Sequence, residues 1–86
     1  MKFDAYADED TEFIVEIESA GIERRVYQFA MEIKGGGKWK KIILKPNAFK
    51  EIITSAPLDS FAGGSSLSFL SENEDVEFAI TNILWL

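Results

Sequence analysis

The sequence contains neither cysteine nor histidine. The absence of cysteine excludes a disulfide framework, a thiolate nucleophile and a thiolate metal ligand. The absence of histidine removes the most common general base and the most common transition-metal ligand. Serine is present, but a serine nucleophile needs a nearby base, and the only candidates are lysines that lie almost entirely in one segment. We therefore expect no catalytic activity, no cofactor and no small-molecule substrate.

Long apolar runs are missing as well. No segment approaches the roughly 18 consecutive apolar residues of a membrane span, and no apolar stretch follows the positive charge of Lys2. These features predict a cytoplasmic protein without membrane contact. A chain of 86 residues has room for one domain and little for a second, and its 47% of hydrophobic residues is enough to form a core. Residues 1–86 are therefore predicted to form a single domain.

The segment Asp8-Glu9-Asp10-Thr11-Glu12 places carboxylates at alternate positions, as calcium-binding loops do. Phe13 stands where an EF-hand loop requires glycine, and Ser19 stands where it requires the last acidic ligand. We interpret the segment as an acidic turn between two strands and expect no metal site.

Alternation of apolar and polar side chains predicts several β-strands. Residues 12–19 alternate large apolar residues with glutamates, and residues 25–33 repeat an alternating pattern. The run Gly35-Gly36-Gly37 supplies a reversal into a further strand. We expect the strands on either side of this run to form an antiparallel meander with residues 12–19. The predicted strands are 1–7, 12–19, 25–33, 39–45 and 67–70.

One helix is predicted at about residues 46–56. Pro46 has the fixed φ that favours a first helical turn, and Pro57 ends the pattern. The C-terminal residues 72–86 fit both a strand and a helix, and their β-branched and aromatic content favours a strand. The apolar residues at helical spacing in the predicted helix are Phe49, Ile52, Ile53 and Ala56.

Together these elements predict an α+β fold. It consists of an antiparallel sheet of four to six strands with the helix at about 46–56 packed on one face. The residues expected in its core are Phe13, Val15, Ile17, Phe29, Ile43, Phe49, Ile53 and Leu70.

Charge is sharply segregated along the chain, whose formal net charge is −6. Residues 1–33 carry nine acids and three bases, residues 34–50 carry six lysines and no acid, and residues 51–86 carry six acids and no base. One interpretation is structural, because cross-strand pairs of opposite charge stabilise a sheet by about 0.2 to 1 kcal/mol each. The alternatives are an anionic ligand and self-association through oppositely charged faces. The acids expected opposite the lysines are Glu12, Glu16, Glu18 and Glu77.

The leading functional hypothesis is a non-catalytic module that binds a protein partner or a second copy of itself. Inhibitors, immunity-type proteins and small self-assembling accessory proteins work in this way. A carboxylate-rich surface would steer a basic partner toward the protein. The acidic residues assigned to this surface are Asp8, Asp10, Glu12, Glu16, Glu18, Glu72 and Glu74.

The alternative hypothesis is binding of single-stranded nucleic acid or another polyanion through the basic segment 34–50. An outward-facing tryptophan beside lysines can stack a base and contact phosphate, as in sequence-tolerant single-strand binders. The residues assigned to this site are Lys38, Trp39, Lys40, Lys41 and Lys45.

Overall fold

The computed structural model describes residues 1–19, 25–62, 64–71 and 75–84, and strands are the main secondary structure within them. The only helical element among these residues is a single 3-10 turn, η1. The elements are β1 (Lys2–Ala7), β2 (Thr11–Ser19), β3 (Val26–Ile33), β4 (Lys40–Ile43), η1 (Pro46–Ala48), β5 (Lys50–Glu51), β6 (Gly64–Ser71) and β7 (Phe78–Leu84).

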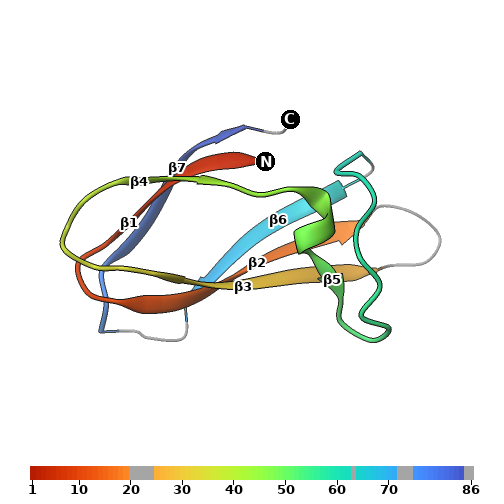
Figure 1. The fold of residues 1–86 in the computed structure, drawn as a ribbon, viewed down its shortest axis with the longest axis horizontal. Helices are drawn as coiled ribbons and strands as arrows, with labels where there is room; N and C mark the ends of the chain where they lie inside the picture. Colours follow the sequence, from red (N-terminus) through yellow and green to blue (C-terminus); the bar gives the residue numbers. More distant parts are fainter. Residues whose placement is uncertain (20–24, 63, 72–74, 85–86) are drawn as a thin grey trace.

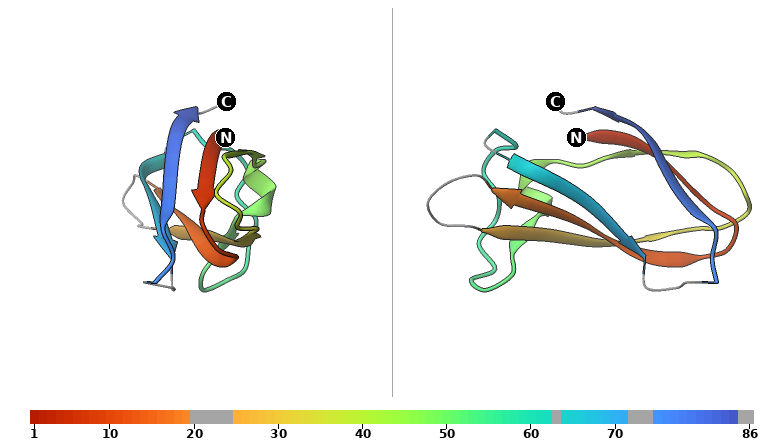
Figure 2. Two further views of the ribbon diagram at one scale, coloured as in Figure 1. Left: turned by 90° about the vertical axis from the view of Figure 1, so that its left-hand side faces the viewer. Right: turned by 180° about the vertical axis from the view of Figure 1, so that it is seen from behind.

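The strands form two antiparallel sheets that pack on one another (Figures 1 and 2). One sheet has three strands in the order β4-β1-β7, and the other has four in the order β5-β3-β2-β6. The fold is therefore an all-β sandwich, and the predicted α+β fold with one helix-covered sheet is wrong. The C-terminal segment is a strand over Phe78–Leu84, as its β-branched content favoured.

Aromatic side chains from the two sheets meet in the core. Phe3 of β1 contacts Phe13 of β2 edge-on, with ring centroids 6.4 Å apart. Phe3 also contacts Phe69 of β6 at 5.1 Å, and Phe13 contacts Phe78 of β7 at 5.0 Å. Such pairs add about 0.5 to 1.5 kcal/mol each beyond the area that they bury. Rings from both sheets thus fill one shared core.

The core prediction is correct for half of its residues. Phe13, Val15, Ile17 and Phe49 are buried, and Phe29 is partly buried against them. Three predicted core residues are exposed instead: Ile43 at 69%, Ile53 at 85% and Leu70 at 45%. Ile43 and Leu70 lie on outward faces of their strands, whereas Ile53 lies in a turn.

The predicted helix at 46–56 ends after one turn because its residues satisfy their backbone groups differently. Phe49 is extended, and its buried ring lies between Phe29 at 6.0 Å and Phe61 at 5.8 Å. Lys50–Glu51 then pairs with β3. The buried Glu51 carboxylate accepts hydrogen bonds from the Ile53 backbone N–H at 2.6 Å and the Thr54 hydroxyl at 3.3 Å. These contacts favour a tight turn over a helix in a segment whose β-branched residues are weak helix formers.

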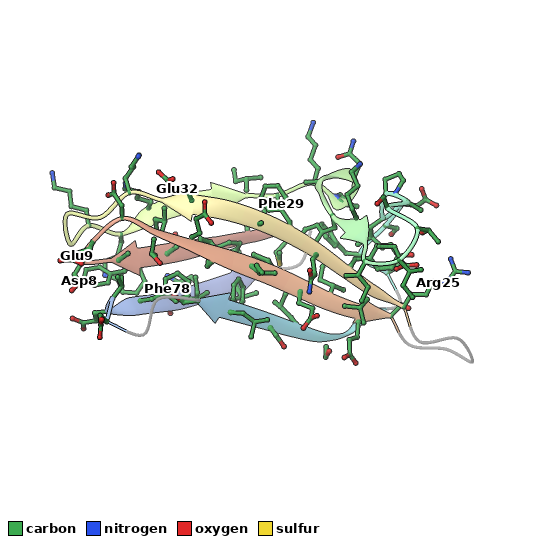
Figure 3. The ribbon with its side chains drawn as sticks, turned by 90° about the horizontal axis from the view of Figure 1, so that it is seen from below. Asp8, Glu9, Arg25, Phe29, Glu32 and Phe78 are labelled. Carbon is green, nitrogen blue, oxygen red and sulfur yellow. The ribbon has the colours of Figure 1, made fainter. Side chains whose placement is uncertain are left out.

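The predicted meander is correct for β2 and β3 but wrong for β4. β4 pairs with β1 in the other sheet. The pairing continues one residue beyond both strands, where Met1 and Leu44 exchange two backbone hydrogen bonds of 2.8 Å. Two of the chain's crossings between the sheets, from β1 to β2 and from β3 to β4, therefore lie together at one end of the sandwich. Figure 3 shows Asp8 and Glu9 of the first crossing at the end opposite Arg25.

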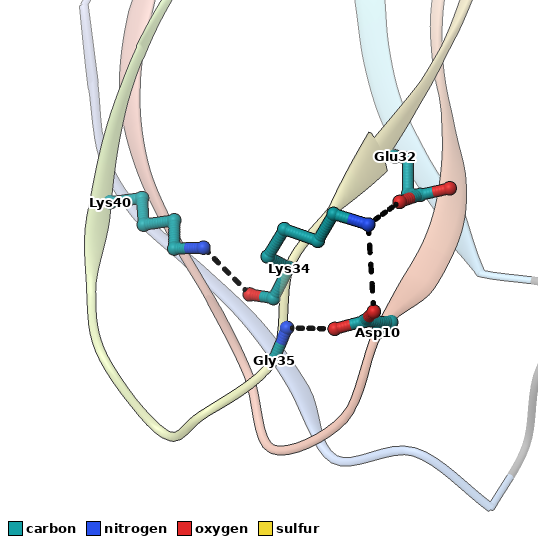
Figure 4. Close-up of polar contacts among 5 residues, drawn as sticks. All are labelled: Asp10, Glu32, Lys34, Gly35 and Lys40. Atoms are coloured by element: carbon teal, nitrogen blue, oxygen red, sulfur yellow. Dashed lines mark hydrogen bonds and ion pairs between the residues drawn. The ribbon is translucent and has the colours of Figure 1, made fainter.

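The two crossings are fastened to each other through glycine backbone (Figure 4). Gly36 and Gly37 donate backbone hydrogen bonds of 3.1 Å to the carbonyls of Asp8 and Ala7. Gly35 donates to the Asp10 carboxylate at 2.7 Å. A Cβ on Gly35 would fall on the backbone of Glu9. Only glycine allows this close approach of the two segments.

Gly35→Ala is expected to destabilise the protein by about 1 to 3 kcal/mol, because the added methyl group forces the two crossings apart. Gly64→Ala is the control, since its Cβ would meet its nearest atoms, Phe61 O and Ile17 Cγ2, at 3.4 and 3.5 Å. Urea unfolding followed by tryptophan fluorescence measures both variants. Equal stability of Gly35→Ala and the parent would contradict the role of Gly35.

The Asp10 carboxylate is expected to make the stability of the fold depend on pH. Its pKa lies below the ordinary value of 3.8, first because the Gly35 N–H donates to it and then because Lys34 is near. A carboxyl group whose pKa is lower in the folded state stabilises the fold above pH 3.8, and this contribution is lost as the pH falls through the folded-state pKa. Asp10→Asn keeps the acceptor for Gly35 but removes the charge.

We therefore expect Asp10→Asn to be less stable than the parent near about pH 6 and to approach it near about pH 2. Urea midpoints across this range test the expectation. Asp59→Asn, which removes the same charge from an exposed loop, controls for net charge. Parallel pH curves for Asp10→Asn and the parent would contradict it.

Candidate binding surface

The outer face of the three-stranded sheet carries the basic segment. β4 and its flanking residues alternate, so that every second side chain from Trp39 to Lys45 lies outward and is exposed. Lys2 of β1 lies on the same face, opposite Ile43, and Lys38 is exposed in the preceding loop. We call this set the basic–aromatic surface. Its residues are Lys2, Tyr6, Lys38, Trp39, Lys41, Ile43 and Lys45.

An aromatic pair lies at one end of this surface. Tyr6 of β1 and Trp39 have ring centroids 5.5 Å apart and an interplanar angle of 44°. The β1–β4 register, in which Ala5 faces Lys40, places the two rings side by side when it is extended by one residue. Trp39 keeps 53% of its surface exposed. A large apolar ring that is supported on one side and open to solvent is a platform for a flat ligand.

The lysines of this surface form no ion pair with the part of the chain that the structure describes. Among the described residues, neither Lys38, Lys41 nor Lys45 forms an ion pair or a hydrogen bond through its side chain. Lys41 faces Asp4 across the strand pair, yet the two form no ion pair. Three ammonium groups are therefore available to an anion.

The remaining lysines of the basic segment are engaged elsewhere. The Lys40 side chain donates to the Lys34 carbonyl at 2.9 Å, as Figure 4 shows, so Lys40 does not join the outer face. Lys34 pairs with Glu32 at 2.6 Å and Asp10 at 3.6 Å. The Lys34 pKa is raised, first by the hydrogen bond to Glu32 and then by the charges of Glu32 and Asp10. Lys50 donates to the Asn47 carbonyl at 3.3 Å.

The predicted pairing of lysines with glutamates of β2 is wrong. β2 lies between β3 and β6, so Glu12 faces Glu32, Glu16 faces Gln28 and Ser68, and Glu18 faces Val26 and Ser66. Glu16 accepts a hydrogen bond from Gln28 at 3.1 Å. The backbone N–H of Glu77 donates to Asp8. Lys34 is the one lysine of the segment that forms ion pairs with carboxylates of the described residues.

The acidic residues assigned to partner binding that the structure describes lie in two places. Asp8 and Asp10 lie at the crossings, where their carboxylates accept backbone hydrogen bonds from Glu77 and Gly35. Glu72 and Glu74 lie outside the described residues. The three glutamates of β2 do share the outer face of the four-stranded sheet with Glu32, around the aliphatic side chains of Ile14 and Leu70. We call this set the acidic sheet face: Glu12, Ile14, Glu16, Glu18, Ala30, Glu32 and Leu70.

Sequence reasoning assigned Trp39, Lys41 and Lys45 to the site, but it missed Tyr6. The alternation of Phe3, Ala5 and Ala7 with Asp4 and Tyr6 carried the signal that Tyr6 faces outward. The contact between Tyr6 and Trp39 depends on the β1–β4 pairing, which the alternation does not specify.

Comparisons of the chain with protein-family models, with curated proteins and with solved structures found no match. Within the described ranges, no group of three or more acidic side chains is placed so that it could hold a metal ion. None of the described helical structure has the length and apolar character needed to cross a membrane.

Proposed function

We propose that the basic–aromatic surface binds single-stranded nucleic acid. The observation that carries the proposal is the Tyr6–Trp39 pair, in which Trp39 is exposed, beside lysines that have no acidic partner among the described residues. Single-strand binders combine a positively charged track for the backbone with aromatic rings on which bases stack. The proposal places the protein in the cytoplasm, where single-stranded RNA is abundant.

The two parts of the surface have separate tasks. A base stacks on the open side of Trp39, and stacking of this kind contributes about 1 to 3 kcal/mol per base. Lys41 and Lys45 lie four residues apart on an extended segment, about 13 Å along the strand, and contact phosphates of the same strand. Lys38 adds a third ammonium group on the other side of Trp39.

Trp39→Ala is expected to weaken binding of a labelled single-stranded oligonucleotide about 5-fold to about 150-fold, which corresponds to the loss of one stacked base. Fluorescence anisotropy at about 50 and about 200 mM salt measures the affinity and its salt dependence. Real phosphate contacts require a steep loss of affinity at the higher salt concentration. No binding at the lower concentration would refute the proposed function.

A matched pair of lysine variants separates specific contacts from net charge. Lys41→Ala and Lys50→Ala remove the same charge, but Lys50 lies in β5 of the other sheet. We expect Lys41→Ala to lower the slope of log affinity against log salt by about 0.7, the contribution of one phosphate contact. Lys50→Ala is expected to leave the slope unchanged, and equal effects of both variants would contradict the site.

A second candidate function is binding of a basic protein partner by the acidic sheet face. The observation that favours it is that Glu12 faces Glu32 on the neighbouring strand and, unlike Glu32, which pairs with Lys34, forms no ion pair with any described residue, because like charges in this position destabilise a sheet. The exposed Leu70 and neighbouring Ile14 supply an apolar centre between the carboxylates. A second copy of the chain, presenting its basic–aromatic surface, is one such partner.

Glu12→Lys tests this second function. It converts a like-charge pair into an opposite-charge pair, so the variant should be more stable by about 0.2 to 1 kcal/mol in urea unfolding. It should also weaken binding of an oligoarginine peptide in a salt-dependent manner. Glu9→Lys makes the same charge change in the crossing loop. Equal loss of peptide binding in both variants would show that only net charge matters.

A further inference from the structure

One acidic side chain, Asp4, lies in the middle of the basic–aromatic surface. It is on the same face of β1 as Tyr6, two residues away, and it faces Lys41 of β4 and Thr81 of β7. Its Oδ2 atom accepts a hydrogen bond of 2.8 Å from the side-chain amide of Asn82. Among the described residues, Oδ1 has no partner.

The position of this carboxylate is at odds with phosphate binding alone. A carboxylate repels a phosphate group, and next to Lys41 it cancels part of the charge that attracts the strand. It is also held in place, because Asn82 has a positive φ of 55° at a register shift in the β1–β7 pairing and directs its amide to Asp4. A fixed, half-paired acceptor on such a surface is suited to a hydrogen-bond donor of the ligand.

Nucleobases carry such donors on their edges. Asp4 lies about 7 Å along the strand from Tyr6, within reach of the edge of a base stacked on the Tyr6–Trp39 pair. Cytosine, adenine and guanine each present an exocyclic amino group, and carboxylates accept hydrogen bonds from such groups. Thymine and uracil have no amino group, and their single ring N–H lies between two carbonyl oxygens that repel a carboxylate.

We infer that Asp4 makes the surface selective for amino-bearing bases and disfavours thymine and uracil. Asn82 is the positioning residue that fixes the carboxylate. The exposed Thr81 hydroxyl, which faces Asp4 from β7, can donate to the unprotonated ring nitrogen that adjoins the amino group of cytosine or adenine. This inference rests on the proposed function.

The test compares oligo-dC with oligo-dT of equal length by fluorescence anisotropy at about 50 mM salt. Both are pyrimidine strands with the same backbone charge, so the ratio of their affinities reports on the hydrogen-bonding edges of the bases. We expect oligo-dC to bind about tenfold more tightly. In Asp4→Asn the ratio should fall to about one, mainly because oligo-dT binds more tightly once the repelling charge is removed.

Two further variants keep the test specific. Glu12→Gln removes the same charge from the other sheet and should leave the dC:dT ratio unchanged. Asn82→Gly keeps the Asp4 charge and permits the positive φ but loses the hydrogen bond that orients Asp4, and it should reduce the ratio about threefold. This variant still tests the role of Asp4 if Asp4→Asn does not fold.

The outcomes separate the inference from the proposed function. If neither oligonucleotide binds, the proposed function fails and the inference fails with it. If both bind equally tightly and Trp39→Ala weakens both, the proposed function stands and the base selectivity is refuted. A preference for oligo-dC that persists in Asp4→Asn also refutes the role of Asp4.

Discussion

The close contact between the backbones of Gly35 and Glu9 is the constraint on which the rest of the architecture depends. It brings together the two chain crossings, which the backbone hydrogen bonds of Gly36 and Gly37 then fasten. With the crossings joined, the chain leaving β3 is led onto the β1 edge and cannot return beside β3. The lysine segment therefore reaches a sheet that the glutamates of β2 do not belong to.

This routing separates charge into two faces of the sandwich. A meander would have set β4 beside β3, one strand from the glutamates of β2, whereas the observed topology leaves Glu12 opposite Glu32 and Lys41 without an ion pair among the described residues. Cross-strand charge pairs contribute at most about 1 kcal/mol each. Burial of one phenylalanine in the core contributes about 1.5 to 3 kcal/mol, so the aromatic core outweighs the charge pairs that the topology forgoes.

The sequence patterns predicted the strands well and their arrangement poorly, for physical reasons. Alternation is a local property, and it located the ends of β1, β2, β3 and β4 to within one or two residues. Pairing partners depend on Gly35 meeting Glu9, which no period encodes. The helix failed because Phe49 and Ile52 match helical spacing, while the Glu51 carboxylate stabilises a turn instead. Lys38, Lys41 and Lys45 of the candidate site were predicted, but Lys2, Tyr6 and Asp4 required the register.

A net charge of −6 is compatible with binding of a polyanion because the two outer faces are electrostatically separated. Stacked sheets lie about 10 Å apart, and the Debye length is about 10 Å at 0.1 M salt. At that ionic strength, the potential above Trp39 and Lys41 is set mainly by the nearby lysines. The Debye length reaches about 30 Å at 0.01 M salt, so the glutamates of the opposite face then oppose binding. The gain in affinity at low salt must therefore level off, which a uniformly basic surface would not show.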